Sequence, residues 1–281
     1  NLLQQDLEVA VAEVGQYRDA GGETIVDVTT VGIAPNPLGL AGVSRRTGVQ
    51  ILAGTGFYIG GSYESVVPDM SVEALADYMR RELLEGIAGT PVRAGLIGEL
   101  GVGNPPSAME QRVLVAAGRV QREVGCAVSL HPVWGTRPAE NALSVARLAL
   151  EAGLDPQRTA LCHLDVRFRD AIELYREVGR EGFYLELDTF GRETYYPHVD
   201  TQLPSDAERI RTVVGLLQEG FGERVLVGAD ICFSNELVRH GGHGYAHVLR
   251  TVCPRLERQG VDADALRAIL VHNPRRWLAG A

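Results

Sequence analysis

Lysine is absent from the 281-residue chain, so all 27 of its basic residues are arginines. The chain has 36 acidic residues and a formal net charge of -9. An acidic surface repels nucleic acid and anionic lipid, so neither is an expected partner. There is also no signal-peptide pattern and no apolar run of about 18 residues, the length that a membrane span needs. These absences predict a cytoplasmic protein with neither nucleic acid nor a membrane as its partner.

Cysteine is scarce and widely spaced, and no C-x-x-C pair occurs. The four cysteines lie at Cys126, Cys162, Cys232 and Cys253, mostly in apolar runs. This pattern favours buried, reduced thiols over a zinc ribbon or a disulfide framework.

Short apolar runs alternate with longer amphipathic segments along the whole chain, and no linker divides it. Nearly continuous apolar runs of this length are typical of strands in a parallel sheet that is covered on both faces. The expected strands span residues 24–30, 49–58, 92–100, 126–131, 159–163, 183–188 and 224–230. The expected helices span residues 3–20, 71–85, 107–124, 140–153, 168–179, 205–219 and 244–260.

The alternation predicts an α/β fold with a parallel sheet in one domain, residues 1–281. Seven strand–helix units are one fewer than a (β/α)₈ TIM barrel contains, so we expect a TIM barrel whose first strand is absent from this chain. A doubly wound open sheet is the competing architecture. No G-x-G-x-x-G motif follows the first strand, which argues against dinucleotide binding. Helices are expected to end at Gly153, Gly179 and Gly220. The segment NPRRWL (273–278) is predicted to begin a helix that seals the bottom or side of the barrel.

Polar residues close five of the expected strands: Glu99, His131, His163, Asp188 and Asp230. The carboxyl ends of parallel barrel strands all open on one face, so these side chains are expected to converge there. Imidazoles together with carboxylates suit Zn²⁺ or a similar divalent ion. Taken singly, each residue is also explained as a hydrogen-bonded structural histidine, a helix cap or a turn residue. The recurrence at matching strand ends favours a metal site.

Several stretches along the chain resemble, in order, the phosphotriesterase family of the amidohydrolase superfamily. The nearest likeness is to the phosphotriesterase-related proteins, a group that includes an N-acetyltaurine hydrolase. The matching stretches are IVDVTTVGI (25–33), GTGFY (54–58), GLIGELG (95–101), VSLHP (128–132), CHLD (162–165), YLELDTFG (184–191), LPSDAERI (203–210), VLVGADI (225–231), LVRHGGHGYAHVL (237–249) and ILVHNPRRWL (269–278).

The resemblance implies a metal-dependent hydrolase with two divalent ions, Zn²⁺ by preference. His131 and His163 stand where the family places ligands of the second metal. Asp230 stands at the position of a ligand that also handles the proton. Glu99 takes the place of the carboxylated lysine that bridges both ions in phosphotriesterases proper, and a chain without lysine cannot use that modified residue.

One family feature is missing, because no H-x-H motif, the ligand pair of the first metal, occurs in the chain. The missing strand and the missing ligands point to the same gap, and we expect a preceding segment to supply both. If the chain truly starts here, one weakly held ion or none is expected. In that case an inactive homologue or a small-ligand-binding barrel is the alternative to an enzyme.

The expected reaction is attack of metal-bound hydroxide on an amide, lactone or ester. An N-acyl amino acid-like amide or a lactone is favoured, with phosphotriester hydrolysis as a side activity. The expected substrate-binding residues are Tyr58 and, in the loop after the last strand, Arg239, His243 and Tyr245, each with surface, loop-ordering or packing roles as the alternative. Asp188 is expected to support a ligand histidine. A homodimer is a family-level expectation.

Overall fold

The fold is built around one parallel sheet of seven strands in a computed structural model that describes residues 4–65, 67, 69–133, 138–165, 172–197 and 200–280. The sheet order is β1-β2-β3-β4-β5-β6-β9, so the strands follow their order in the chain, with only the separate β7–β8 hairpin standing between β6 and β9. The strands are β1 (Thr24–Asp27), β2 (Gln50–Thr55), β3 (Leu96–Val102), β4 (Ala127–Pro132), β5 (Thr159–Leu161), β6 (Tyr184–Leu187) and β9 (Val225–Val227).

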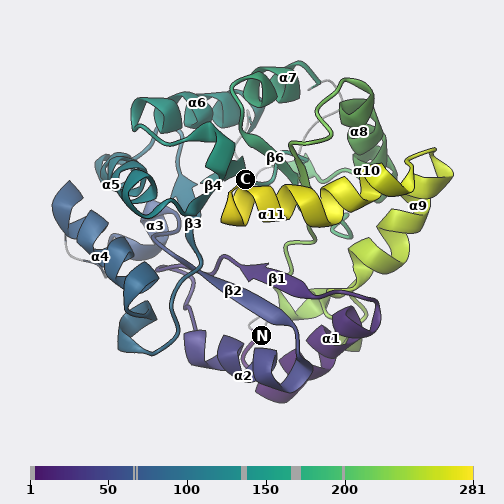
Figure 1. Ribbon diagram of the computed structural model, residues 1–281, viewed down its shortest axis with the longest axis horizontal. Coiled ribbons are helices and arrows are strands. Elements are labelled where there is room, and N and C mark those ends of the chain that lie inside the picture. The colour runs from purple at the N-terminus through teal and green to yellow at the C-terminus, as the bar shows by residue number, and fades with distance from the viewer. Residues whose placement is uncertain are drawn as a thin grey trace.

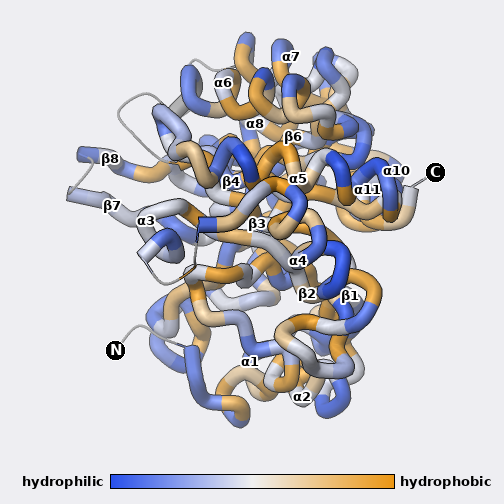
Figure 2. The backbone as a smooth tube through the Cα atoms, turned by 90° about the vertical axis from the view of Figure 1, so that its left-hand side faces the viewer, coloured by the Kyte–Doolittle hydropathy of each residue, from blue (hydrophilic) through white to orange (hydrophobic). Residues whose placement is uncertain are grey.

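The sheet curls into a barrel that lacks one strand, with β1 and β9 as its two edges (Figure 1). The strand order never reverses, whereas a doubly wound sheet needs a reversal point. The predicted α/β barrel with one strand absent is therefore confirmed, and the open-sheet alternative is wrong. A short antiparallel hairpin of β7 (Tyr195–Tyr196) and β8 (Thr201–Gln202) projects from the body of the molecule (Figure 2).

Most helices surround the sheet on its outer side, whereas α11 lies across the middle of the view in Figure 1. Each parallel connection must return the chain to the same end of the sheet, and the helices provide this return. They are α1 (Leu7–Asp19), α2 (Pro37–Thr47), α3 (Gly60–Tyr63), α4 (Val72–Leu84), α5 (Ala108–Val124), α6 (Pro138–Glu151), α7 (Ile172–Arg180), α8 (Asp206–Gln218), α9 (Cys253–Arg258), α10 (Ala263–Arg267) and α11 (Asn273–Ala279). No helix among the described residues is both long and apolar enough to cross a membrane.

Local sequence explains where these helices begin and end. Ser107 and Ser205 each form a capping box with the glutamate three residues later, which satisfies free N–H groups of the first turn. The prediction that Gly179 ends its helix is wrong, because α7 continues to Arg180 and the chain turns at Gly182, with φ +98°. Glycine is needed at that turn because other residues are strained at such a φ.

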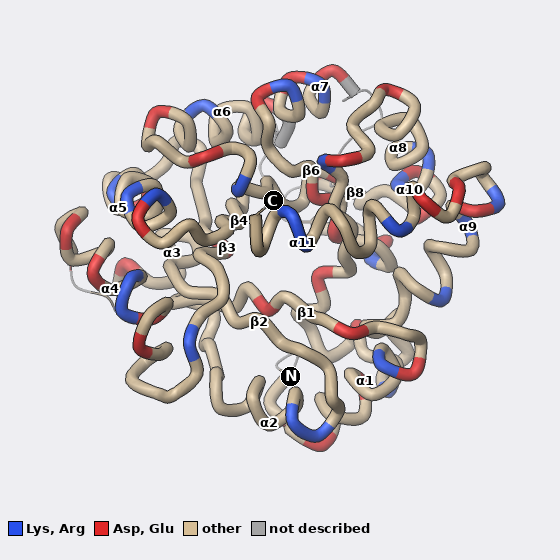
Figure 3. The backbone as a smooth tube through the Cα atoms, viewed as in Figure 1, with Lys and Arg blue, Asp and Glu red and all other residues tan. Residues whose placement is uncertain are grey.

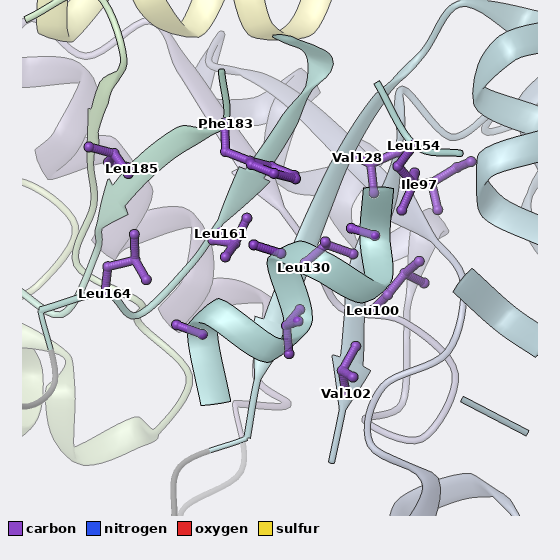
Figure 4. Close-up of a cluster of buried hydrophobic side chains, with 14 of the residues drawn as sticks. Ile97, Leu100, Val102, Val128, Leu130, Leu154, Leu161, Leu164, Phe183 and Leu185 are labelled. Carbon is purple, nitrogen blue, oxygen red and sulfur yellow. The ribbon is translucent and has the colours of Figure 1, made fainter. Parts of the chain in front are cut away.

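The main hydrophobic core lies between the outer face of the sheet and the helices. Alternate strand residues point outward, and Figure 4 shows Ile97, Val128, Leu130, Leu161 and Leu185 gathered there. All five are fully shielded from solvent. Each such side chain stabilises the fold by roughly 1.5–3 kcal/mol through removal of apolar surface from water.

The inner face of the sheet is filled by a second cluster. Leu96, Ala127, Ala160, Tyr184 and Leu226 come from five different strands, and the side chain of Trp277 from α11 packs among them. The indole Nε1 donates a hydrogen bond to the backbone oxygen of Val128 at 3.2 Å. The predicted closure of the barrel by the NPRRWL segment is thus confirmed.

Charged residues lie mainly on the outer helices, with a few acidic positions on the strands within (Figure 3). Of the four cysteines, which are all free, Cys126 and Cys162 are buried as expected, but Cys232 is exposed. The expectation of a buried thiol is therefore wrong for Cys232, because it lies in the loop after β9 rather than in a strand.

Candidate metal centre

The polar residues predicted at strand ends do lie at the carboxyl end of the sheet. Glu99 lies within β3 and His131 within β4, whereas His163, Asp188 and Asp230 follow β5, β6 and β9. The backbone of His163 and Asp230 is left-handed, with φ of 56° and 43°. This conformation is unfavourable for residues other than glycine and is concentrated at functional sites.

Three of these side chains converge. His131 Nδ1 lies 3.2 Å from Glu99 Oε2, and His163 Nε2 lies 3.7 Å from the same oxygen. The two ring nitrogens are 2.9 Å apart. Ligands about 2.1 Å from a tetrahedral Zn²⁺ are about 3.4 Å from one another. The spacing and chemistry of this donor set therefore fit a single divalent cation.

Cys162 is a fourth member of the group that sequence reasoning missed. Its sulfur and the three other ligand atoms all lie within 4.8 Å of one another. The sulfur lies 3.6 Å from Glu99 Oε2 and 3.1 Å from the Leu130 carbonyl oxygen, and its single S–H can donate to either of them. Burial and the charge of Glu99 raise the pKa of Cys162 well above its usual value. As a protonated thiol it is a neighbour of the candidate ligands.

Asp188 holds His163 in place. Its Oδ1 accepts hydrogen bonds from both the backbone N–H and the Nδ1 of His163, each at 2.9 Å. With Nδ1 occupied, Nε2 is the nitrogen left to face Glu99 and His131. Burial acts to lower the pKa of His163, but the nearby carboxylates, Asp188 foremost, raise it well above its usual value.

Asp230 is held differently, because its carboxylate is bound by an arginine. Arg192 Nη1 contacts Asp230 Oδ2 at 2.6 Å, and Arg192 Nε contacts Glu236 Oε1 at 2.6 Å. Burial raises the pKa of Asp230 to about 7, against the opposing charges of His163 and Arg192. Asp230 is not among the four residues whose ligand atoms converge in the described part of the chain. Arg192 was missed by sequence reasoning, because nothing in its local pattern separates it from 26 other arginines.

The four predicted substrate-binding residues occupy different environments. The hydroxyl of Tyr58 lies 3.4 Å from His131 Nε2, so this side chain borders the converging group. Arg239 is exposed, and its backbone N–H donates to Glu13 Oε1 at 2.9 Å. Tyr245 packs into a small cluster with residues of α1 and α2, away from the converging group, and His243 faces a cavity.

That cavity has a volume of about 640 Å³ and lies among the loops that follow β6 and β9. Arg192 forms part of its wall and also binds Asp230, so the cavity begins one side chain away from Asp230. Its lining consists of Gly191, Arg192, Thr194, Tyr196, Phe233, Asn235, Glu236, Gly241, Gly242, His243 and His247.

Known proteins are similar to this chain in sequence and in fold. An N-acetyltaurine hydrolase from Homo sapiens is 37% identical over 278 residues, which cover 98% of this chain and 78% of that protein. The corresponding protein from Danio rerio is 39% identical over 280 residues, covering 99% of this chain and 79% of its own.

Solved structures agree with this likeness. A resiniferatoxin-binding protein from Rhodobacter sphaeroides superimposes with a TM-score of 0.92 at 37% identity, covering 98% of this chain and 75% of that one. A phosphotriesterase homology protein from Escherichia coli, complexed with phosphate in its active site, gives a TM-score of 0.87 at 27% identity, covering 98% and 90%. The profile of the phosphotriesterase family matches residues 2–278. With this match and these relatives, the chain belongs to the phosphotriesterase family.

Proposed function

We propose that this chain forms one hydrolase domain that cleaves an amide, lactone or ester with the help of a divalent cation. Glu99, His131 and His163 would hold the cation, and zinc is the metal that this mixed nitrogen and oxygen donor set suits best. The observation that carries the proposal is the approach of His131 Nδ1, His163 Nε2 and Glu99 Oε2 to within 3.7 Å of one another. A cation bound there supplies Lewis acidity, which polarises a carbonyl and activates water at neutral pH.

Three further residues would support the reaction: Asp188 and Arg192 position side chains, and Asp230 transfers a proton. Asp188 fixes the ring of His163 through two hydrogen bonds to one carboxylate oxygen. Arg192 binds Oδ2 of Asp230, which leaves Oδ1 as the oxygen that accepts and returns a proton. A carboxyl with a pKa of about 7 suits proton transfer near neutral pH. Asp230 would therefore carry the proton to the leaving group.

The substrate class follows from the relatives. Proteins named N-acetyltaurine hydrolase are 36–40% identical to this chain. A phosphotriesterase-like lactonase mutant from Deinococcus radiodurans is 29% identical, with a TM-score of 0.79. An N-acyl amide or a lactone is therefore the favoured substrate, with phosphotriester hydrolysis as a weak side activity.

Metal analysis and activity measured together test this proposal. We expect the purified protein to contain at least one zinc ion per chain and to hydrolyse a member of a panel of N-acyl amides and lactones. Exhaustive chelation should abolish the activity, and added zinc should restore it. His163→Ala should lose metal and activity, whereas His272→Ala, at an exposed histidine, should lose neither. Activity that survives chelation would contradict the metal-dependent mechanism.

A small-ligand-binding barrel is the second candidate function. The observation that favours it is the 37% identity and TM-score of 0.92 to the resiniferatoxin-binding protein. A protein of this kind would bind ligand in the cavity without turnover and without metal. Absence of metal from the purified protein, together with no hydrolysis across the panel after zinc is added, would favour this second function.

A further inference from the structure

Glu236 is a buried glutamate in the loop after β9, with a side chain that is only 6% exposed. Its Oε2 accepts hydrogen bonds from the backbone N–H groups of Cys232 and Phe233 at 2.9 and 2.8 Å. Its Oε1 accepts one from Arg192 Nε at 2.6 Å. One carboxylate therefore joins the chain just after Asp230 to an arginine from the segment after β6.

Arg192 reaches Asp230 with the part of its guanidinium that Glu236 leaves free. Nη1 donates to Asp230 Oδ2 at 2.6 Å, and Nη2 contacts the Asp230 carbonyl. A guanidinium can also bind both oxygens of one carboxylate through two parallel hydrogen bonds. Because Glu236 holds Nε, the guanidinium stays in the orientation that engages Oδ2, and Oδ1 remains available.

Glu236 is held in turn by helix α1. Both carboxylate oxygens of the buried Glu13 accept backbone hydrogen bonds from this loop, from Val238 at 3.0 Å and from Arg239 at 2.9 Å. These residues begin the short helix Val238–His240, which has no side-chain cap of its own. Figure 1 shows α1 beside the segment that runs from β9 towards α9. The α1 helix, which precedes one edge of the sheet, thus fixes the loop that follows the other edge.

We propose that Glu236 is a positioning residue for proton transfer by Asp230. The inference rests on the proposed function, in which Asp230 Oδ1 takes a proton from the attacking water. Oδ1 then returns that proton to the leaving nitrogen or oxygen as its bond to the carbonyl carbon breaks. Glu236 acts through Arg192, because it keeps the guanidinium on Oδ2. Without Glu236 the guanidinium turns to bind both oxygens of Asp230 and occupies Oδ1.

The leaving-group dependence of Glu236→Gln tests this role. Glutamine keeps the size of the side chain but replaces one acceptor oxygen by an NH₂ group, so it cannot serve both Arg192 and the backbone donors. We expect kcat to fall about 10-fold, with KM unchanged, for the best substrate of the panel, whose amine or alkoxide leaving group needs a proton. For p-nitrophenyl acetate, whose p-nitrophenolate leaves as an anion, the loss should be only about 2-fold.

The control for this variant is Glu257→Gln, at an exposed glutamate of α9, which should change neither rate. A purely structural role for Glu236 would reduce both rates by the same factor, through loss of folded protein. Equal losses for the two substrates would therefore overturn the inference.

A double-mutant cycle shows whether Glu236 acts through the arginine. In an Arg192→Met background Glu236→Gln should change kcat by less than about 2-fold, because no guanidinium is left to turn. An effect of Glu236→Gln that is the same with and without Arg192 would contradict the inference.

A second variant, Glu13→Gln, leaves the Glu236 side chain intact and loosens the loop that carries it. We expect an approximately 3-fold loss of kcat with the same dependence on the leaving group. Glu8→Gln, at an exposed glutamate of the same helix, is the matched control and should not lower kcat.

Amide hydrogen exchange reads the contacts of Glu236 without any turnover. Glu236→Gln should speed exchange at Cys232 and Phe233 by about 10-fold, whereas Glu257→Gln should not. A wild-type protein that hydrolyses nothing in the panel would refute the proposed function, and with it the positioning role, even if exchange responds as expected. An active wild-type protein whose Glu236→Gln variant retains full kcat would refute this inference alone and leave the hydrolase intact.

Discussion

His163 shows how single side chains are prepared for chemistry at the mouth of the barrel. Its backbone has a φ of 56°, and its ring is fixed by Asp188 at 2.9 Å. A strained backbone and an occupied Nδ1 together leave only Nε2 to face Glu99 and His131. Such supporting carboxylates orient metal-binding imidazoles and increase their basicity.

Replacement of that carboxylate should weaken metal binding. We expect Asp188→Asn to lower zinc affinity about 10–100-fold, because the ring of His163 loses its charged partner. Competition with a fluorescent chelator would measure the affinity. Asp264→Asn removes an exposed carboxylate on α10 and serves as the matched control. Equal affinities in wild type and Asp188→Asn would contradict the assignment of His163 as a ligand.

Asp206 provides a pH-dependent contribution to stability. Burial acts to raise its pKa, but hydrogen bonds from His247 and Gly191 and the charge of Arg209 lower it below the usual value. A folded-state pKa below the unfolded value stabilises the protein above the unfolded pKa, about 3.9. That stabilisation disappears as the pH falls through the folded-state pKa.

Thermal unfolding of Asp206→Asn at two pH values checks this. At pH 7 the variant should be less stable than wild type by about 1.5–3 kcal/mol, as expected for lost hydrogen bonds to a charged group. The difference should be smaller at the lower, acidic pH, because this stabilisation is lost as the pH falls from about 3.9 through the folded-state pKa of Asp206. A difference that is the same at both pH values would show that the charge of Asp206 contributes nothing.

At the scale of elements, α11 acts as the closure of the barrel. It contributes Trp277 to the inner cluster, where the indole is only 3% exposed. Arg158, which precedes β5, donates to the Trp277 and Leu278 carbonyls at 2.8 and 3.0 Å and so binds the end of this helix. Packing and capping together fix α11 across strands that are distant in sequence.

Truncation of this side chain should therefore be costly. We expect Trp277→Ala to lower the free energy of unfolding by about 3–5 kcal/mol, because it leaves a cavity in the barrel interior. Trp277→Phe keeps much of the volume but leaves the Val128 carbonyl without its donor, so a loss of about 1–3 kcal/mol is expected. Urea unfolding measures both. Similar values for wild type and the alanine variant would mean that the barrel interior does not depend on α11.

At the scale of the whole molecule, the candidate ligands tie separate parts of the chain together. Glu99, His131 and His163 come from β3, β4 and the segment after β5. A cation that binds only when these strands are assembled stabilises the folded state by mass action.

Bound metal should therefore raise the melting temperature. With free zinc at 100 times its Kd the gain is about 2.7 kcal/mol, which corresponds to a rise of about 5 °C for a protein of this size. Differential scanning calorimetry with added zinc and with chelator measures the shift. His163→Ala should melt at the same temperature in both conditions. A wild-type protein that is indifferent to zinc would count against the site.

The amino-acid sequence alone determined the order of the strands, the barrel and the strand-end residues. These follow from the length, apolar content and hydrophobic period of each segment, which can be read without knowing its tertiary contacts. It missed α2, because the hydrophobic pattern of this helix is weak. The cap at Asn36 and the proline at Pro37 were local signals of where the helix begins. It also could not show that Cys162 joins the converging group or that Arg192 binds Asp230, because these contacts join residues from different strands and loops. Only the tertiary structure decided them. The fold buries Arg192 beside the carboxylates of Asp230 and Glu236, and the curvature of the sheet brings the strand ends together.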